Sequence, residues 1–139
     1  QHLKHPEYTK LTLVDKIPNQ FKFECSLDYE YRHIEDFKHL VRVFAKTCEM
    51  PDNTFSALCA TSELLYDNAL KNRPKHLKYM DFVICEGEDF FQMTIKECGK
   101  PCDPVAHGLV NAELCGADSI DYRYMFGMNV TSVKWGKGL

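Results

Sequence analysis

The chain has 139 residues, of which 45% are hydrophobic and 27% are charged. These proportions are typical of one folded domain and exclude a disordered tail. The 17 basic and 20 acidic residues give a net charge of −3, which favours neither a nucleic acid nor an anionic membrane surface as partner. No apolar stretch is long enough for a transmembrane helix, so we expect no membrane insertion.

Cysteine is the most informative residue type in this composition. Small secreted domains add disulfides because a small core stabilises them only marginally. The sequence therefore predicts a secreted, extracellular, cysteine-rich domain with a disulfide framework. An odd number of cysteines leaves one thiol, which could be buried or could link two copies into a homodimer. The disulfide candidates are Cys25, Cys48, Cys59, Cys85, Cys98, Cys102 and Cys115.

Zinc is the main alternative use of the cysteines. Cys98, Cys102, His107 and Cys115 follow the pattern C-x3-C-x4-H-x7-C, and thiolate and imidazole are zinc ligands. The spacing is looser than that of a structural zinc knuckle, and the remaining cysteines would have no role. We therefore predict no metal and no cofactor.

The N-terminal residues 1–25 are predicted to form an extended arm or a short hairpin. Leu11 and Leu13 alternate with a polar residue, and so do Phe21 and Phe23. A proline–asparagine pair between the two segments offers a turn.

Two amphipathic helices are predicted next. Residues 28–48 carry apolar residues spaced three and four apart, which places them on one helical face. Those residues are Ile34, Phe37, Val41, Phe44 and Cys48. A second helix opens at Pro51 and ends before Pro74.

Residues 74–98 keep the same three-four spacing and predict a third helix, in which Gly87 marks a kink, a break into two helices or the close approach of another backbone. A short helix is expected to open at Asp103 and to end at Gly116. The final segment, residues 117–139, is an aromatic tail in which Val130 to Trp135 could form a strand.

These elements together predict a mainly α fold, a disulfide-stapled bundle of four to five helices. It would be a single domain, with the extended arm or short hairpin at residues 1–25, a helical core at residues 28–116, and the aromatic tail at residues 117–139. Helices joined by short loops pack as antiparallel neighbours, which is the basis of this arrangement.

One stretch resembles a known family. Residues 90–126 contain an FF pair, a Cys-x3-Cys pattern, a predicted short helix, a Cys-Gly pair and a polar-aromatic segment. In this order the stretch resembles the last third of a nematode-expanded family of secreted, cysteine-rich helical domains of unknown function. The resembling residues are Phe90, Phe91, Cys98, Cys102, Cys115 and Gly116. The resemblance implies secretion and a disulfide-linked helical fold, and it implies no activity.

No motif in the chain names a reaction. The serine nucleophile elbow G-x-S-x-G is absent from the sequence, and the cysteines are better explained as disulfides than as nucleophiles. His33 and His76 lie near aspartates and leave a secreted hydrolase as a third hypothesis. Apolar side chains between helices leave a carrier of a small hydrophobic ligand as the alternative function.

The predicted function is a secreted, non-enzymatic binding protein that recognises an extracellular or cell-surface protein. Tyrosine and tryptophan are enriched at protein interfaces, so we choose Tyr122, Tyr124 and Trp135 as the binding residues. Asn129 lies in the N-x-[ST] sequon and is predicted to carry a glycan, which would make the protein a glycoprotein.

Overall fold

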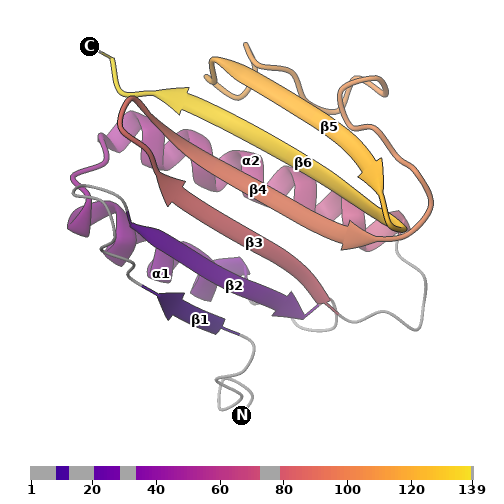
Figure 1. Ribbon diagram of the computed structural model, residues 1–139, viewed down its shortest axis with the longest axis horizontal. Helices are drawn as coiled ribbons and strands as arrows, with labels where there is room; N and C mark the ends of the chain where they lie inside the picture. Colours follow the sequence, from indigo (N-terminus) through magenta and orange to yellow (C-terminus); the bar gives the residue numbers. More distant parts are fainter. Residues whose placement is uncertain (1–8, 13–20, 29–33, 73–78, 139) are drawn as a thin grey trace.

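The structure is a computed structural model that describes residues 9–12, 21–28, 34–72 and 79–138. Within these residues it has six strands and two helices (Figure 1). The elements are β1 Thr9–Thr12, β2 Lys22–Asp28, α1 Ile34–Thr47, α2 Asp52–Asn72, β3 Tyr79–Glu86, β4 Phe90–Cys98, β5 Ser119–Met125 and β6 Met128–Gly136. All strands join one antiparallel sheet in the order β1-β2-β3-β4-β6-β5.

The predicted mainly α bundle is wrong, because most of the described elements belong to this sheet. Figure 1 shows both helices on the same face of the sheet, with α1 behind β2 and β3 and α2 behind β4 and β6. We call this face the inner face. The fold is therefore two layers, a sheet and a helix pair, with the core between them.

Helix α1 confirms the amphipathic prediction for residues 28–48, although the helix begins at Ile34. Its apolar stripe is buried against the sheet. The Phe37 ring lies 4.6 Å from the Phe82 ring of β3, and the Phe44 ring lies 6.2 Å from the Phe23 ring of β2. These fully buried aromatic contacts explain why the helix covers this part of the sheet.

Helix α2 confirms the second predicted helix almost to its bounds. Its buried residues face the sheet, where the Ser62 hydroxyl lies 2.9 Å from the Met93 sulfur of β4. Phenylalanine and methionine side chains that could have lined a ligand cavity instead fill this layer; Phe37, Phe44, Phe82, Phe91, Met80 and Met93 are each at most 2% exposed.

The third predicted helix, residues 74–98, is wrong. In its place the chain forms β3 and β4, joined by a turn in which the Gly87 amide donates to the Phe90 carbonyl at 2.7 Å. The buried residues alternate along each strand, which is the period of a sheet with one covered face. The helical core predicted at residues 28–116 therefore holds only two helices in the described residues.

The predicted short helix after Asp103 is also absent, and residues 99–118 run as successive turns. The Asp103 carboxylate accepts from the Val105 and Ala106 amides, and Gly116 has φ +60°. The capping residues were thus identified correctly, but they organise turns. The aromatic tail is the β5–β6 hairpin, and the N-terminal hairpin alternative is confirmed by the pairing of β1 with β2.

The predicted disulfide framework is wrong as well, since all seven cysteines are free thiols. Adjacent-strand geometry gives one reason. Cys25 faces the buried core, whereas Cys85, on the neighbouring strand, lies on the opposite face of the sheet. Likewise Cys98 is exposed, while the Cys102 sulfur lies 4.0 Å from Asn68 of α2, on the inner face.

Candidate functional site

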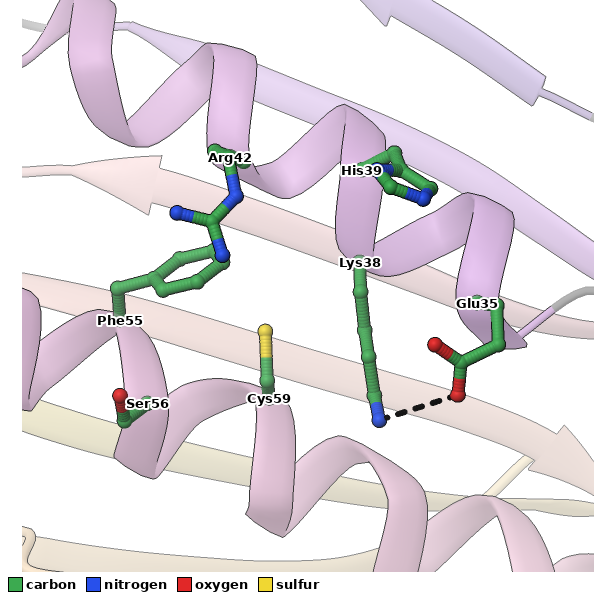
Figure 2. A pocket seen from close by; sticks show the side chains of 7 residues that line it. All are labelled: Glu35, Lys38, His39, Arg42, Phe55, Ser56 and Cys59. Atoms are coloured by element: carbon green, nitrogen blue, oxygen red, sulfur yellow. Dashed lines mark hydrogen bonds and ion pairs between the residues drawn. The ribbon is translucent and has the colours of Figure 1, made fainter.

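A cleft of about 320 Å³ lies between α1 and α2, on the side of the helices away from the sheet (Figure 2). The Arg42 guanidinium lies over the Phe55 ring, 4.5 Å from its centroid. The Lys38 ammonium contacts Glu35 at 3.4 Å and Glu63 at 2.8 Å. The cleft is open to solvent, and most of its charge is paired internally.

Cys59 lies on the floor of this cleft and points from α2 toward α1 in Figure 2. Burial raises the pKa of the Cys59 thiol, although Lys38 and Arg42 act in the opposite direction. A thiol with a raised pKa stays protonated near neutral pH and is a poor nucleophile. We therefore assign no chemistry to the cleft.

A second region combines buried polar groups with exposed aromatic groups. It is formed by the end of β4, the β5–β6 hairpin and residues 99–107, and we call it the hairpin end. Three of the residues singled out in the sequence, Tyr122, Tyr124 and Asn129, lie here.

The hairpin end is built around the Asn129 side chain, which is 3% exposed. Its Oδ1 accepts from the Cys102 amide at 2.8 Å and from the Tyr122 hydroxyl. Its Nδ2 donates to the Lys100 carbonyl at 2.9 Å. These bonds fix the start of the 99–118 segment to β6, because a buried amide left unbonded would be costly.

Tyrosine hydroxyls add to this network. The Tyr122 hydroxyl also accepts from the Cys102 amide at 3.2 Å, and burial raises the pKa of the Tyr122 phenol, so that it stays protonated. The Tyr124 hydroxyl donates to the Gly99 carbonyl at 2.8 Å, and the Gly99 amide donates to the Gly127 carbonyl at 3.3 Å. The tip of the hairpin is therefore bonded on one side to residues 99–102.

At this tip the chain exposes an aromatic ring. Phe126 and Gly127 form a two-residue turn between β5 and β6, with φ values of 53° and 74°. A turn of this kind requires positive φ at both central residues and prefers Asn-Gly or Asp-Gly. A bulky residue at positive φ is strained. Nevertheless Phe126 stands here, and it is 92% exposed.

A thiol and an imidazole also meet at the hairpin end. The Cys102 sulfur lies 3.7 Å from His107 Nδ1. Nucleophilic catalysis by such a pair needs a third group that orients the imidazole. Among the described residues the His107 ring has no second hydrogen-bond partner, so none of them supplies that group.

Glu97 has the most perturbed carboxyl of the hairpin end. It faces the same side of the sheet as Asn129, its partner across β4 and β6. Burial raises the pKa of Glu97 to about 7, and a hydrogen bond from Asn129 lowers it in part. The folded protein therefore holds this proton at pH values where the unfolded chain has released it.

We expect this proton to make the protein less stable as pH rises. The free energy of unfolding should fall between about pH 4.5 and pH 7, because only the unfolded state ionises Glu97 freely there. Glu97→Gln should remove the fall and stabilise the protein by about 1 kcal/mol above pH 7, allowing for solvent screening. Urea unfolding at pH 5 and pH 8 measures both effects.

The matched control is Glu88→Gln, which neutralises an exposed carboxyl in the β3–β4 turn. The free energy of unfolding of this variant should change between pH 5 and pH 8 by the same amount as that of the wild type. If Glu97→Gln and the wild type lost the same stability between pH 5 and pH 8, the assignment of this titration to Glu97 would be wrong.

The three predicted binding residues do not form one surface. Trp135 is 2% exposed, and its indole nitrogen donates to the Cys115 carbonyl at 3.0 Å, so it belongs to the core. Tyr122 is half-buried in the Asn129 network, and Tyr124 is 41% exposed beside the tip. Phe126 was missed, although a glycine after an alternating aromatic segment could have indicated the turn.

The structure places the predicted glycosylation site in an unfavourable position. The Asn129 nitrogen that would carry the glycan is bonded to Lys100, in a buried side chain. A glycan there would have to displace the 99–102 segment, because glycosylated asparagines lie at the surface. The glycan stays a prediction, and this geometry disfavours it.

Other sequence hypotheses find no site. Of the residues considered for zinc, Cys102 and His107 meet, but Cys98 and Cys115 do not complete a site with them. The part of the chain that the structure describes holds no group of three or more His, Cys, Asp or Glu residues arranged for a metal. His33 and His76, considered for a hydrolase, lie outside the described residues. None of the described helices is long and apolar enough to span a membrane.

Comparison with known proteins does not assign the chain to a family. No family model matches the chain, and no curated protein is significantly similar to it. The resemblance to the nematode-expanded family therefore stays a prediction, and the function has to be argued from the geometry of the chain.

Proposed function

We propose that this protein is a non-enzymatic binding protein that recognises a protein partner through the tip of the β5–β6 hairpin. The observation that carries the proposal is Phe126, a phenylalanine that is 92% exposed and held at φ 53°. Asparagine or aspartate would fit this turn with less strain and would not expose a ring to water. Strain retained at an exposed position is characteristic of functional sites.

The neighbours of Phe126 extend the apolar tip. Met125 is 37% exposed and Tyr124 is 41% exposed, both on the same hairpin. Aromatic and methionine side chains are enriched at interfaces, where a central aromatic residue commonly contributes much of the binding energy. The complementary partner is a protein with an apolar pocket that accepts the Phe126 ring.

Rigidity supports the same function. The tip is bonded to residues 99–102 through Tyr124, Gly127 and the Asn129 network. A surface that is already ordered loses less conformational entropy when it binds. The inferred secretion rested on disulfides that the structure lacks, so the extracellular location stays a prediction and plays no part in this proposal.

Phe126→Asn is the direct test, because asparagine tolerates positive φ. We expect the variant to be about 1 kcal/mol more stable than the wild type, since the turn is relieved of strain. We also expect its affinity for the partner to fall at least about tenfold, since the aromatic anchor is lost. A photo-crosslinking residue at position 126 identifies the partner, and titration of the purified partner measures the affinity.

The control is Val43→Gln, which removes an apolar side chain that is 51% exposed on α1 and leaves the hairpin unchanged. This variant should bind like the wild type. Equal affinity of the wild type and Phe126→Asn, or equally efficient crosslinking of the partner from positions 43 and 126, would reject the tip as the binding site.

A further inference from the structure

Strand β5 is an edge of the sheet. It pairs with β6 on one side and ends the strand order on the other (Figure 1). Five of its seven residues are exposed. An edge strand offers a row of backbone donors and acceptors to another strand, and proteins usually protect long edges with charge, bulges or a covering segment.

The turn at Phe126 decides which backbone groups point outward. A two-residue turn makes its flanking residues, Met125 and Met128, a hydrogen-bonded pair. Alternation then directs the amides and carbonyls of Ile120, Tyr122 and Tyr124 away from β6. Among the described residues no backbone hydrogen bond reaches this outer edge. The 99–118 segment, which runs beside β5 in Figure 1, is hydrogen-bonded to the strand through the hydroxyls of Tyr122 and Tyr124.

The charges on β5 are self-complementary. Asp121 and Arg123 flank Tyr122, and their side chains are 65% and 64% exposed. If two copies of β5 pair antiparallel with Tyr122 facing Tyr122, then Asp121 of each copy faces Arg123 of the other. Those positions are non-hydrogen-bonded pairs, where side chains come closest.

Neighbouring registers are disfavoured by the same charges. Moving the two-fold axis by one residue places Asp121 opposite Asp121, or Arg123 opposite Arg123. Like charges directly opposite each other destabilise a strand pair. Within one chain Asp121 and Arg123 contact each other at 3.4 Å, a weak exposed pair that can rearrange at little cost.

We propose that two copies of this chain dimerise by antiparallel pairing of β5 with β5, centred on Tyr122. The two sheets then form one continuous sheet. Ile120 of one copy faces Tyr124 of the other on the inner face, and the two Asp121–Arg123 pairs lie on the outer face. Isologous contacts of this kind are the usual basis of two-fold dimers.

The dimer goes beyond the proposed function and leaves the tip free. The pairing ends at Met125, so Phe126 of each copy lies past the paired region. The antiparallel arrangement places the two tips at opposite ends of the strand pair, about 27 Å apart at the rise of an antiparallel strand. Two tips on one dimer would bind a repeated or clustered partner with increased avidity.

Charge exchange tests the dimer and its register. Sedimentation equilibrium should show a dimer for the wild type. Asp121→Arg or Arg123→Asp alone should weaken dimerisation at least about tenfold, because each creates like-charged pairs. The double variant Asp121→Arg/Arg123→Asp should restore the dimer to within about threefold of wild type, because the pairs are exchanged.

The matched control for Asp121→Arg is Asp67→Arg. It makes the same substitution, with the same change of net charge, at an exposed position of α2. It should dimerise like the wild type. Amide exchange adds a second measurement: protection of the Ile120, Tyr122 and Tyr124 amides should increase with protein concentration.

Two results would overturn the dimer: a wild type that stays monomeric up to its solubility limit, or a dimer that the single charge variants do not weaken. Phe126→Asn should leave dimerisation unchanged, and the double charge variant should keep partner binding. Failure of the dimer is therefore distinguishable from failure of the proposed function.

Discussion

Replacing Trp135 by alanine should lower the free energy of unfolding by about 3–5 kcal/mol. Trp135 lies on the inner face of β6, opposite Phe91 of β4, and is 2% exposed. Its indole nitrogen donates to the Cys115 carbonyl at 3.0 Å. The truncation would open a cavity between sheet and helices and would also leave that buried carbonyl without its donor.

Trp135→Phe helps to separate these two effects, because it removes the donor but keeps an aromatic ring in the core and so leaves a smaller cavity than alanine. We expect it to cost about 1–2 kcal/mol. Urea unfolding followed by far-UV circular dichroism suits both variants, since Trp135 is the only tryptophan and its fluorescence is lost with it. If Trp135→Ala lowered the free energy of unfolding by less than about 1 kcal/mol and abolished partner binding, Trp135 would be an interface residue and not a core residue.

The helices could be predicted because their signal is local. The predicted apolar stripe recurs at helical spacing and is buried, so a single stretch of sequence contains the pattern; its residues are Ile34, Phe37, Val41, Phe44 and Cys48. Pro51 and Pro74 also bound the second helix correctly. Neither signal depends on which distant segment the helix packs against.

The strands β3 and β4 were missed because one set of apolar residues fits two periods. Met80, Ile84, Phe91 and Ile95 are spaced four, seven and four residues apart, which fits a helix, yet each also lies on the buried face of a strand. Phe82 and Met93 complete the alternation within β3 and β4. Only the turn at Gly87, where the two strands meet, distinguishes the patterns.

The candidate site depends on distant residues in a way that sequence spacing does not reveal. Glu97 and Asn129 become neighbours through the register of β4 with β6, and Cys102 reaches them through the turns after Gly99. Cysteine content alone predicted disulfides, but bonding depends on which face of the sheet each thiol occupies. The sequence identified Tyr122 and Asn129 as functional residues, and the structure shows them as supports of the hairpin.

Replacing Asn129 by alanine should lower the free energy of unfolding by about 2–3 kcal/mol. The change removes the acceptor of the Cys102 amide and the Tyr122 hydroxyl, and the donor to the Lys100 carbonyl. Each of these three groups then loses a hydrogen bond at a position where Asn129 itself is 3% exposed, and the Cys102 amide keeps only its longer bond to the Tyr122 hydroxyl, at 3.2 Å. Chemical unfolding measures the loss, and hydrogen exchange should show faster exchange of the Cys102 amide.

Thr131→Val is the control that separates this structural role from glycosylation. It destroys the sequon but leaves Asn129 in place, in a strand where valine is well accommodated. We expect a cost of about 1 kcal/mol, because the change removes the hydroxyl of a buried side chain. If Asn129 acted through a glycan, both variants would lose the same stability when made in a glycosylating host. If it acts through its hydrogen bonds, Asn129→Ala alone is strongly destabilised, and it also binds the partner more weakly because the tip loses its support.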